Sequence, residues 1–135
     1  MKKGITFGAF DLFHAGHVLM MQEAKKVCDH LIVGIHTDPS VERAEKNSPV
    51  QNISERIIQV SACRYVDEVI VYDTEAHVIQ ILGSLSWDVR VLGEEYRHKD
   101  FTGRKETFER CYFNKRSHTF SSSELRARVE KISAS

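Results

Sequence analysis

A nearly continuous apolar segment, His30–His36 (HLIVGIH), places the strongest constraint on how this chain folds. Polar residues bound the segment on both sides, and its interior shows no regular alternation of apolar and polar residues. A strand with one solvated face alternates, whereas a strand buried on both faces is apolar along its length. The segment therefore predicts a strand that is covered on both faces of a sheet.

Strand-like and helix-like segments alternate along the rest of the chain. Further strands are predicted at residues 4–7, 67–72, 88–92 and 110–115. Apolar residues at helical spacing predict helices at residues 16–28, after Asn52, around Val78 and from Ser121, the last with an apolar face of Leu125, Val129 and Ile132. This order predicts an α/β fold: a Rossmann-like, doubly wound, mainly parallel five-stranded sheet with helices on both faces. Ligands of such sheets bind beyond the carboxyl ends of the strands.

Composition limits the class of protein. The 135 residues contain neither a repeat nor a linker-like stretch, so we expect a single domain over residues 1–135. Lys plus Arg equals Asp plus Glu, at 19 each, which disfavours broad binding to nucleic acid or to an anionic membrane. The longest apolar stretch, residues 31–35, is far shorter than the roughly 20 residues of a membrane span. Asp11 interrupts any signal-like start, so a cytoplasmic protein is expected.

The first turn, residues 7–17 (FGAFDLFHAGH), carries the clearest chemical signal. It joins the first predicted strand to the first helix, where free backbone N–H groups and the helix dipole favour an anion. His14 and His17 are three residues apart and can both donate hydrogen bonds to one phosphoryl group. Gly16 keeps side-chain bulk away from an approaching phosphate. The turn lacks the sequence patterns of a P-loop and of a dinucleotide-binding turn.

Three strings in this chain resemble those of one family. Residues 8–17 fit G-x-F-D-x-x-H-x-G-H, residues 64–69 read RYVDEV, and residues 116–122 read RSHTFSS, which resembles the signature RTEGIST. Together they resemble the HxGH nucleotidyltransferase superfamily, and in particular the short bacterial cytidylyltransferases of the glycerol-3-phosphate type. Residues 31–38 are also similar to the second strand of phosphoethanolamine cytidylyltransferases.

The last string departs from the family signature at two positions. His118 stands where the family has an acidic residue, and Thr119 stands where it has a glycine. We expect the glycine's replacement to change the shape of this turn. We expect His118 at the edge of the pocket or on the surface rather than in catalysis.

The resemblance implies a reaction. The phosphate of a small phospho-alcohol attacks the α-phosphorus of CTP, with Mg²⁺ as cofactor, and the products are a CDP-alcohol and pyrophosphate. The first expected acceptor is sn-glycerol 3-phosphate, and phosphoethanolamine, phosphocholine or another phospho-alcohol is the alternative. An adenylyltransferase of the same superfamily and a non-catalytic nucleotide-binding module are the competing functions. The family also leads us to expect a homodimer.

The resemblance assigns roles to individual residues. The expected catalytic residues, which contact and neutralise the triphosphate, are His14, His17, Lys46 and Arg116. The expected nucleotide-binding residues are Phe7, Gly8, Ala9, Phe10, Asp11, Gly16, Gly93, Glu95, Ser121 and Ser122. Candidates for contacts with acceptor or phosphate are Arg56, Arg64 and Lys99. Arg56 and Arg64 are eight positions apart on the helix predicted after Asn52, which places them roughly on one side of it. Asp11 is also the candidate for holding Mg²⁺ beside the triphosphate, with an ordinary turn or cap aspartate as the alternative.

Overall fold

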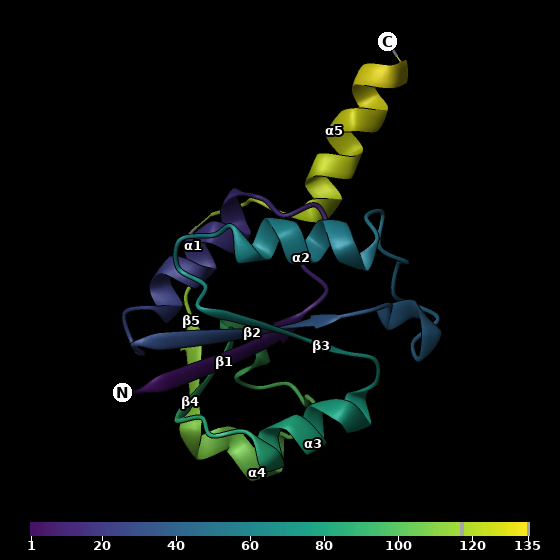
Figure 1. The fold of residues 1–135 in the computed structure, drawn as a ribbon. Helices are drawn as coiled ribbons and strands as arrows, with labels where there is room; N and C mark the ends of the chain where they lie inside the picture. Colours follow the sequence, from purple (N-terminus) through teal and green to yellow (C-terminus); the bar gives the residue numbers. More distant parts are fainter. Residues whose placement is uncertain (117, 135) are drawn as a thin grey trace.

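The computed structural model describes residues 1–116 and 118–134 of the chain. A five-stranded sheet forms its centre, and all four strand pairs are parallel (Figure 1). The strand order is β3-β2-β1-β4-β5. The strands span Lys3–Gly8 (β1), His30–His36 (β2), Glu68–Tyr72 (β3), Val89–Gly93 (β4) and Cys111–Asn114 (β5). The predicted Rossmann-like α/β fold is therefore confirmed, and the strand order reverses at β1, between β2 and β4.

Helices cover both faces of the sheet. Figure 1 shows α1 and α2 over one face and α3 and α4 over the other. The helices span Ala15–Ala24 (α1), Ile53–Ser61 (α2), Glu75–Ser84 (α3), Arg104–Thr107 (α4) and Ser122–Ala134 (α5), and 3₁₀ turns lie at Pro39–Val41, Glu94–Tyr96 and Phe108–Arg110. None of the helices in the described part of the chain is long and apolar enough to cross a membrane.

The packing of the core explains why the segment at residues 31–35 is apolar. Alternate side chains of β2 enter two different hydrophobic clusters: Leu31 and Val33 pack under α1 and α2, and Ile32 packs under α3. Ile5 of β1 is paired with Ile32 in the parallel register and joins the same cluster as Ile32. Because β2 is buried on both faces, its interior positions, residues 31–35, carry no polar side chain.

Two elements differ from the sequence prediction. The helix predicted over residues 16–28 ends at Ala24, where Lys25 caps it and a turn leads into β2. The helix α5 extends away from the sheet in Figure 1, and its expected apolar face does not enter the core. Val129 and Ile132 are 64% and 75% exposed. A period of 3.6 residues identifies a helical face but not the surface against which it packs.

Candidate active site

A cleft of about 500 Å³ opens at the carboxyl ends of the strands, beside the point where the strand order reverses. The β1–α1 turn, the loops after β2 and β4, the end of β5 and the start of α5 all contribute to its lining. Nine of the residues predicted from the sequence line it: Phe7, Gly8, Ala9, Phe10, Asp11, His17, Lys46, Gly93 and Ser122.

The β1–α1 turn has an unusual backbone. Phe10 and Leu12 both have φ of +51°, in the left-handed region that side chains larger than glycine seldom adopt. Such a conformation persists only where surrounding contacts hold it. The ring of Phe10 is buried at 5% exposure, and the Leu12 N–H donates to Oε1 of Gln51 at 2.9 Å. The turn is therefore held from both sides of Asp11.

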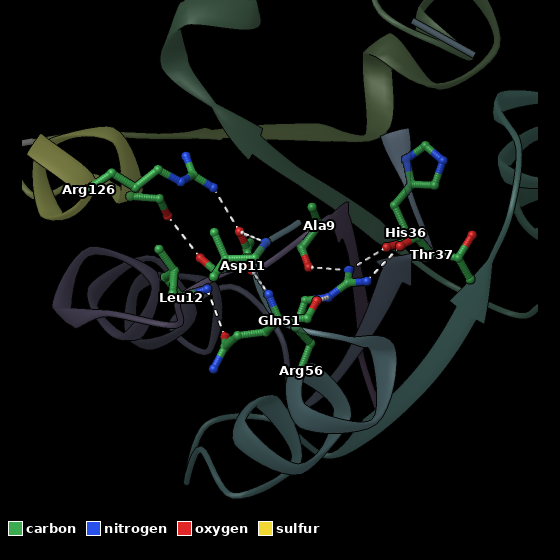
Figure 2. A network of polar contacts seen from close by, with 10 residues as sticks. Ala9, Asp11, Leu12, His36, Thr37, Gln51, Arg56 and Arg126 are labelled. Atoms are coloured by element: carbon green, nitrogen blue, oxygen red, sulfur yellow. Dashed lines mark hydrogen bonds and ion pairs between the residues drawn. The ribbon is translucent and has the colours of Figure 1, made fainter. Parts of the chain in front are cut away.

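Asp11 joins three parts of the chain (Figure 2). Its carboxylate accepts the backbone N–H groups of Val50 at 2.8 Å and Gln51 at 2.9 Å, and Nη2 of Arg126 at 2.7 Å. Its carbonyl oxygen accepts the Ser122 hydroxyl at 2.9 Å. Burial alone would raise the pKa of Asp11, but these hydrogen bonds and the nearby guanidinium hold that pKa below its ordinary value. Asp11 thereby fixes the turn to the segment before α2 and to α5.

These contacts bear on the prediction that Asp11 helps to hold Mg²⁺. A guanidinium and two amide N–H groups occupy three of the sites at which the carboxylate oxygens could accept, and the side chain is only 7% exposed. Among the described residues, no group of three or more His, Cys, Asp or Glu side chains is placed to hold a metal ion. The donor set does not fit a protein-held Mg²⁺, and Asp11 corresponds to the turn aspartate of the alternative interpretation.

Arg56 also differs from its predicted role. It is 1% exposed, and its guanidinium donates to four backbone carbonyls, whose residues are labelled with it in Figure 2. The acceptors are Ala9 at 3.0 Å, His36 at 2.5 Å, Thr37 at 2.6 Å and Gln51 at 3.1 Å. A guanidinium has five N–H donors, so one remains for any other partner. Arg56 is a buried support for the turn and for the end of β2, and not the phosphate contact that was expected.

His14 and His17 are held in one tautomer by the backbone. His14 is the N-cap of α1, and its Nδ1 accepts the Gly16 N–H at 3.0 Å. Nδ1 of His17 accepts the His14 N–H at 3.1 Å, and the two ring centroids lie 3.9 Å apart. Because each Nδ1 is an acceptor, the proton of each neutral ring is on Nε2. Both imidazoles therefore present an Nε2–H donor at the start of a helix.

The electrostatics keep these rings neutral. Burial lowers the pKa of His17 to about 3, with a further contribution from His14. Burial also lowers the pKa of His14, as do the charges of His118 and Arg116. Both histidines are therefore neutral hydrogen-bond donors at pH 7 in the free protein. His14 is not among the residues that line the cleft, but it packs directly against His17, which is.

The two predicted basic residues lie on exposed segments. Lys46 follows the 3₁₀ turn after β2 and lines the cleft together with Arg43. Arg116 follows β5, and its Nη2 donates to the Phe120 carbonyl at 2.7 Å. Ser121 caps α5 by accepting the Glu124 N–H at 3.0 Å, and its hydroxyl keeps a hydrogen to donate. Ser117, which belongs to the same string, lies outside the described residues.

Comparison with known proteins then assigns the family. The sequence model described as cytidylyltransferase-like matches residues 5–128. This chain belongs to the cytidylyltransferase-like family. It is 35% identical over 127 residues to a probable ethanolamine-phosphate cytidylyltransferase of Encephalitozoon cuniculi, covering 90% of this chain and 38% of that protein. It is 38% identical over 96 residues to the bifunctional protein HldE of Paramagnetospirillum magneticum, covering 70% of this chain and 20% of that protein.

The solved structures agree on the fold. A lipopolysaccharide core biosynthesis protein from Thermoplasma volcanium superposes with a TM-score of 0.62 at 22% identity, covering 98% of this chain and 89% of that one. This likeness shows the fold alone. The chain spans less than two fifths of the length of the curated relatives named above.

Three more of the predicted residues that lie outside the cleft lining of this cytidylyltransferase-like chain are Arg64, Glu95 and Lys99. Arg64 was expected on the same helix as Arg56, but α2 ends at Ser61. Arg64 therefore sits in the turn before β3, at the amino end of the sheet, with its guanidinium 5.9 Å from the ring centroid of Tyr65. Lys99 is exposed, and so is Glu95, whose carboxylate folds back against Gly93. Arg64 therefore does not line the cleft of this chain, and its contact with acceptor or phosphate stays a prediction.

The sequence interpretation missed Arg90 as a cleft residue. Arg90 lies on β4, is 4% exposed and lines the cleft. Its guanidinium lies between the rings of Phe7 and Phe101, at 5.3 Å and 5.1 Å from their centroids, and Nη1 donates to the Thr102 carbonyl at 2.6 Å. Its position inside the apolar strand DVRVL was the available signal, because a charge in a buried strand needs partners.

Proposed function

We propose that this chain transfers CMP from CTP to a small phospho-alcohol and releases pyrophosphate. The observation that carries the proposal is the pair of imidazoles at the start of α1, each with Nδ1 held by a backbone N–H and Nε2–H left to donate. Two fixed donors at a helix N-terminus suit the negative charge that develops on a phosphoryl group during transfer. Membership of the cytidylyltransferase-like family supports CTP as the nucleotide.

The reaction asks the protein for positioning and charge neutralisation. An oxygen of the acceptor phosphate forms a bond to the α-phosphorus of CTP, and the bond between that phosphorus and the bridging oxygen of the β-phosphate breaks. The electron pair of that bond leaves with pyrophosphate. His14 and His17 donate to the α-phosphate oxygens, and Lys46 with Arg116 offsets the charge of the outer phosphates. No covalent intermediate on the protein is needed, and any Mg²⁺ is carried by the phosphates, because Asp11 is already engaged.

Phosphoethanolamine is the acceptor that we put first, ahead of sn-glycerol 3-phosphate. Relatives of this chain from Dictyostelium discoideum, Arabidopsis thaliana and Encephalitozoon cuniculi are all named as ethanolamine-phosphate cytidylyltransferases, the last as a probable one. Within the cleft, the carboxylate of Glu75 uses Oε2 to accept the Thr102 hydroxyl at 2.6 Å. Among the residues that the structure describes, Oε1 of Glu75 has no hydrogen-bond partner, and it can pair with an ammonium group. A glycerol acceptor has no cation for this carboxylate.

The test is pyrophosphate release by purified protein with Mg²⁺. CTP, ATP, GTP and UTP are each combined with phosphoethanolamine, phosphocholine and sn-glycerol 3-phosphate, and the products are identified by mass spectrometry. We expect release with CTP and phosphoethanolamine, with CDP-ethanolamine as the product. Release with CTP and glycerol phosphate would replace the acceptor but keep the reaction. Release only with ATP would favour an adenylyltransferase, and CTP binding without release from any pair would favour a nucleotide-binding module.

A further inference from the structure

A third histidine lies beside the pair at the start of α1. His118 belongs to the segment between β5 and α5, about a hundred positions from His14 in the sequence. A Cβ atom built on Gly16 would come within 2.8 Å of Cε1 of His118 and within 2.8 Å of Cε1 of His14. The two imidazoles therefore flank the same glycine, and no larger residue fits at position 16 without displacing one of them. The sequence interpretation placed His118 at the edge of the pocket.

His118 is oriented in the same manner as the other two histidines. Its Nδ1 accepts the Phe120 N–H at 3.1 Å, so the proton of the neutral ring is on Nε2. Its ring stacks on that of Phe120, with centroids 5.1 Å apart and an interplanar angle of 20°. Within residues 1–116 and 118–134, Nε2 of His118 has no hydrogen-bond partner. It is thus a fixed donor without an acceptor, beside two others of the same kind.

We propose that His118 is a third phosphate-binding residue, whose Nε2–H donates to an outer phosphate of the bound nucleoside triphosphate. The inference rests on the proposed function for the identity of the nucleotide, but it needs only a polyphosphate at the start of α1. At this position the Nε2–H of an imidazole can donate to such a ligand in either protonation state. The charge of Arg116 close to His14 marks the same place as suited to an anion.

Two substitutions separate phosphate binding from a merely structural role. In His118→Asn, Oδ1 can still accept the Phe120 N–H, but the donor at the Nε2 position is lost. In His118→Gln, the amide nitrogen reaches the Nε2 position, but the local acceptor is lost. If His118 has only a structural role, His118→Asn should lower the affinity for tripolyphosphate and CTP less than His118→Gln does. If His118 binds phosphate, His118→Gln should lower that affinity less than His118→Asn does. His98→Asn, at an exposed histidine outside the cleft lining, is the matched control.

The experiment is calorimetric binding of inorganic tripolyphosphate and of CTP to the full chain, with thermal melting of every variant. We expect His118→Asn to weaken tripolyphosphate and CTP about tenfold, as for one hydrogen bond to a charged group. His118→Gln should stay within about threefold of the wild type, and cytidine binding should not change. Any one of three results would overturn the inference. The asparagine variant and the wild type could have equal affinities, His118→Asn could have a milder effect than His118→Gln, or the wild type could fail to bind tripolyphosphate. Tripolyphosphate binding without turnover of CTP would overturn the proposed function and leave this inference standing.

Discussion

The β1–α1 turn and the segment after β2, residues 37–50, both reach the cleft, but they are held very differently. The turn contains a buried aspartate with four hydrogen bonds and lies against a buried arginine that binds four carbonyls. In the other segment, residues 41–48 are all exposed. Ser40 bonds to Asp38 and to Ser48, and Oε1 of Glu42 accepts the Glu75 N–H at 2.8 Å.

This difference follows from what each region contributes. Hydrogen bonds from the two imidazoles weaken steeply when distance or angle changes, so the turn that carries them has to be fixed. The attraction between Lys46 and a triphosphate falls off slowly with distance and has little dependence on angle. In the proposed reaction, the charge of Lys46 can therefore act from an exposed loop, whereas the donors of His14 and His17 need a supported turn. The following predictions test this contrast.

The largest effect is expected at the turn itself. His14→Ala removes one fixed donor and the N-cap of α1, and we expect turnover to fall by about 10²–10³-fold. Pyrophosphate release at saturating CTP measures this, with circular dichroism to show that the fold is retained. His98→Ala should match the wild type, and a His14→Ala enzyme with nearly normal turnover would break the assignment of the turn.

A large loss of stability is expected at the support of the turn. Arg56→Met leaves buried carbonyls of Ala9, His36, Thr37 and Gln51 without their donor, and we expect the free energy of unfolding to fall by about 3 kcal/mol. Urea unfolding measures this. The matched change at an exposed arginine, Arg64→Met, should stay within about 0.5 kcal/mol of the wild type. Equal losses for the two variants would contradict the role given to Arg56.

A smaller effect is expected on the exposed segment. Lys46→Ala should raise the KM for CTP about tenfold, because it removes a charge facing the phosphates. Lys46→Arg should restore most of the affinity, since charge matters here more than exact shape. Steady-state kinetics measure both variants, and Lys26→Ala, at an exposed lysine in the turn after α1, serves as the control. If Lys46→Arg does not restore the affinity for CTP, then Lys46 makes a directional contact, and the two regions differ less in how they act on the phosphates.

The smallest effect is a pH dependence of stability. The pKa of His17 is about 3 in the folded chain and 6.5 as its ordinary value, so between these the unfolded chain binds the extra proton. Acidification through this window therefore destabilises the fold. From pH 6.5 to 5.5 the wild type should lose about 1 kcal/mol more than His17→Gln, which has no proton to gain. Urea unfolding at both pH values measures this, and equal losses would show that His17 is not buried as a neutral ring.

The sequence predicted the fold well because its signals were local. The prediction of β2 as a strand buried on both faces, and of alternating strands and helices, depends on the pattern of apolar residues within each segment. The turn proposed to bind phosphate could be identified for the same reason, since His14, Gly16 and His17 lie within four positions of one another.

The supports of the turn were not readable, because they depend on contacts between distant segments. Asp11 meets Arg126, and Arg56 meets Ala9, only after the sheet has formed. Helical spacing placed Arg56 and Arg64 on one side of a helix, and nothing local signalled that α2 would end at Ser61. The same holds for α5, whose apolar positions indicate a helix but not its exposed placement.

The central claim is that the backbone fixes His14 and His17 as neutral Nε2–H donors that meet the phosphates of CTP. A long-range ¹H–¹⁵N correlation spectrum of the labelled protein at pH 7, recorded before and after CTP is added, tests this directly. The predicted result is an Nε2-protonated tautomer for both rings, with resonances that shift on addition of CTP and stay in place with cytidine. Protonation at Nδ1, or resonances that do not move while CTP is being turned over, would contradict it.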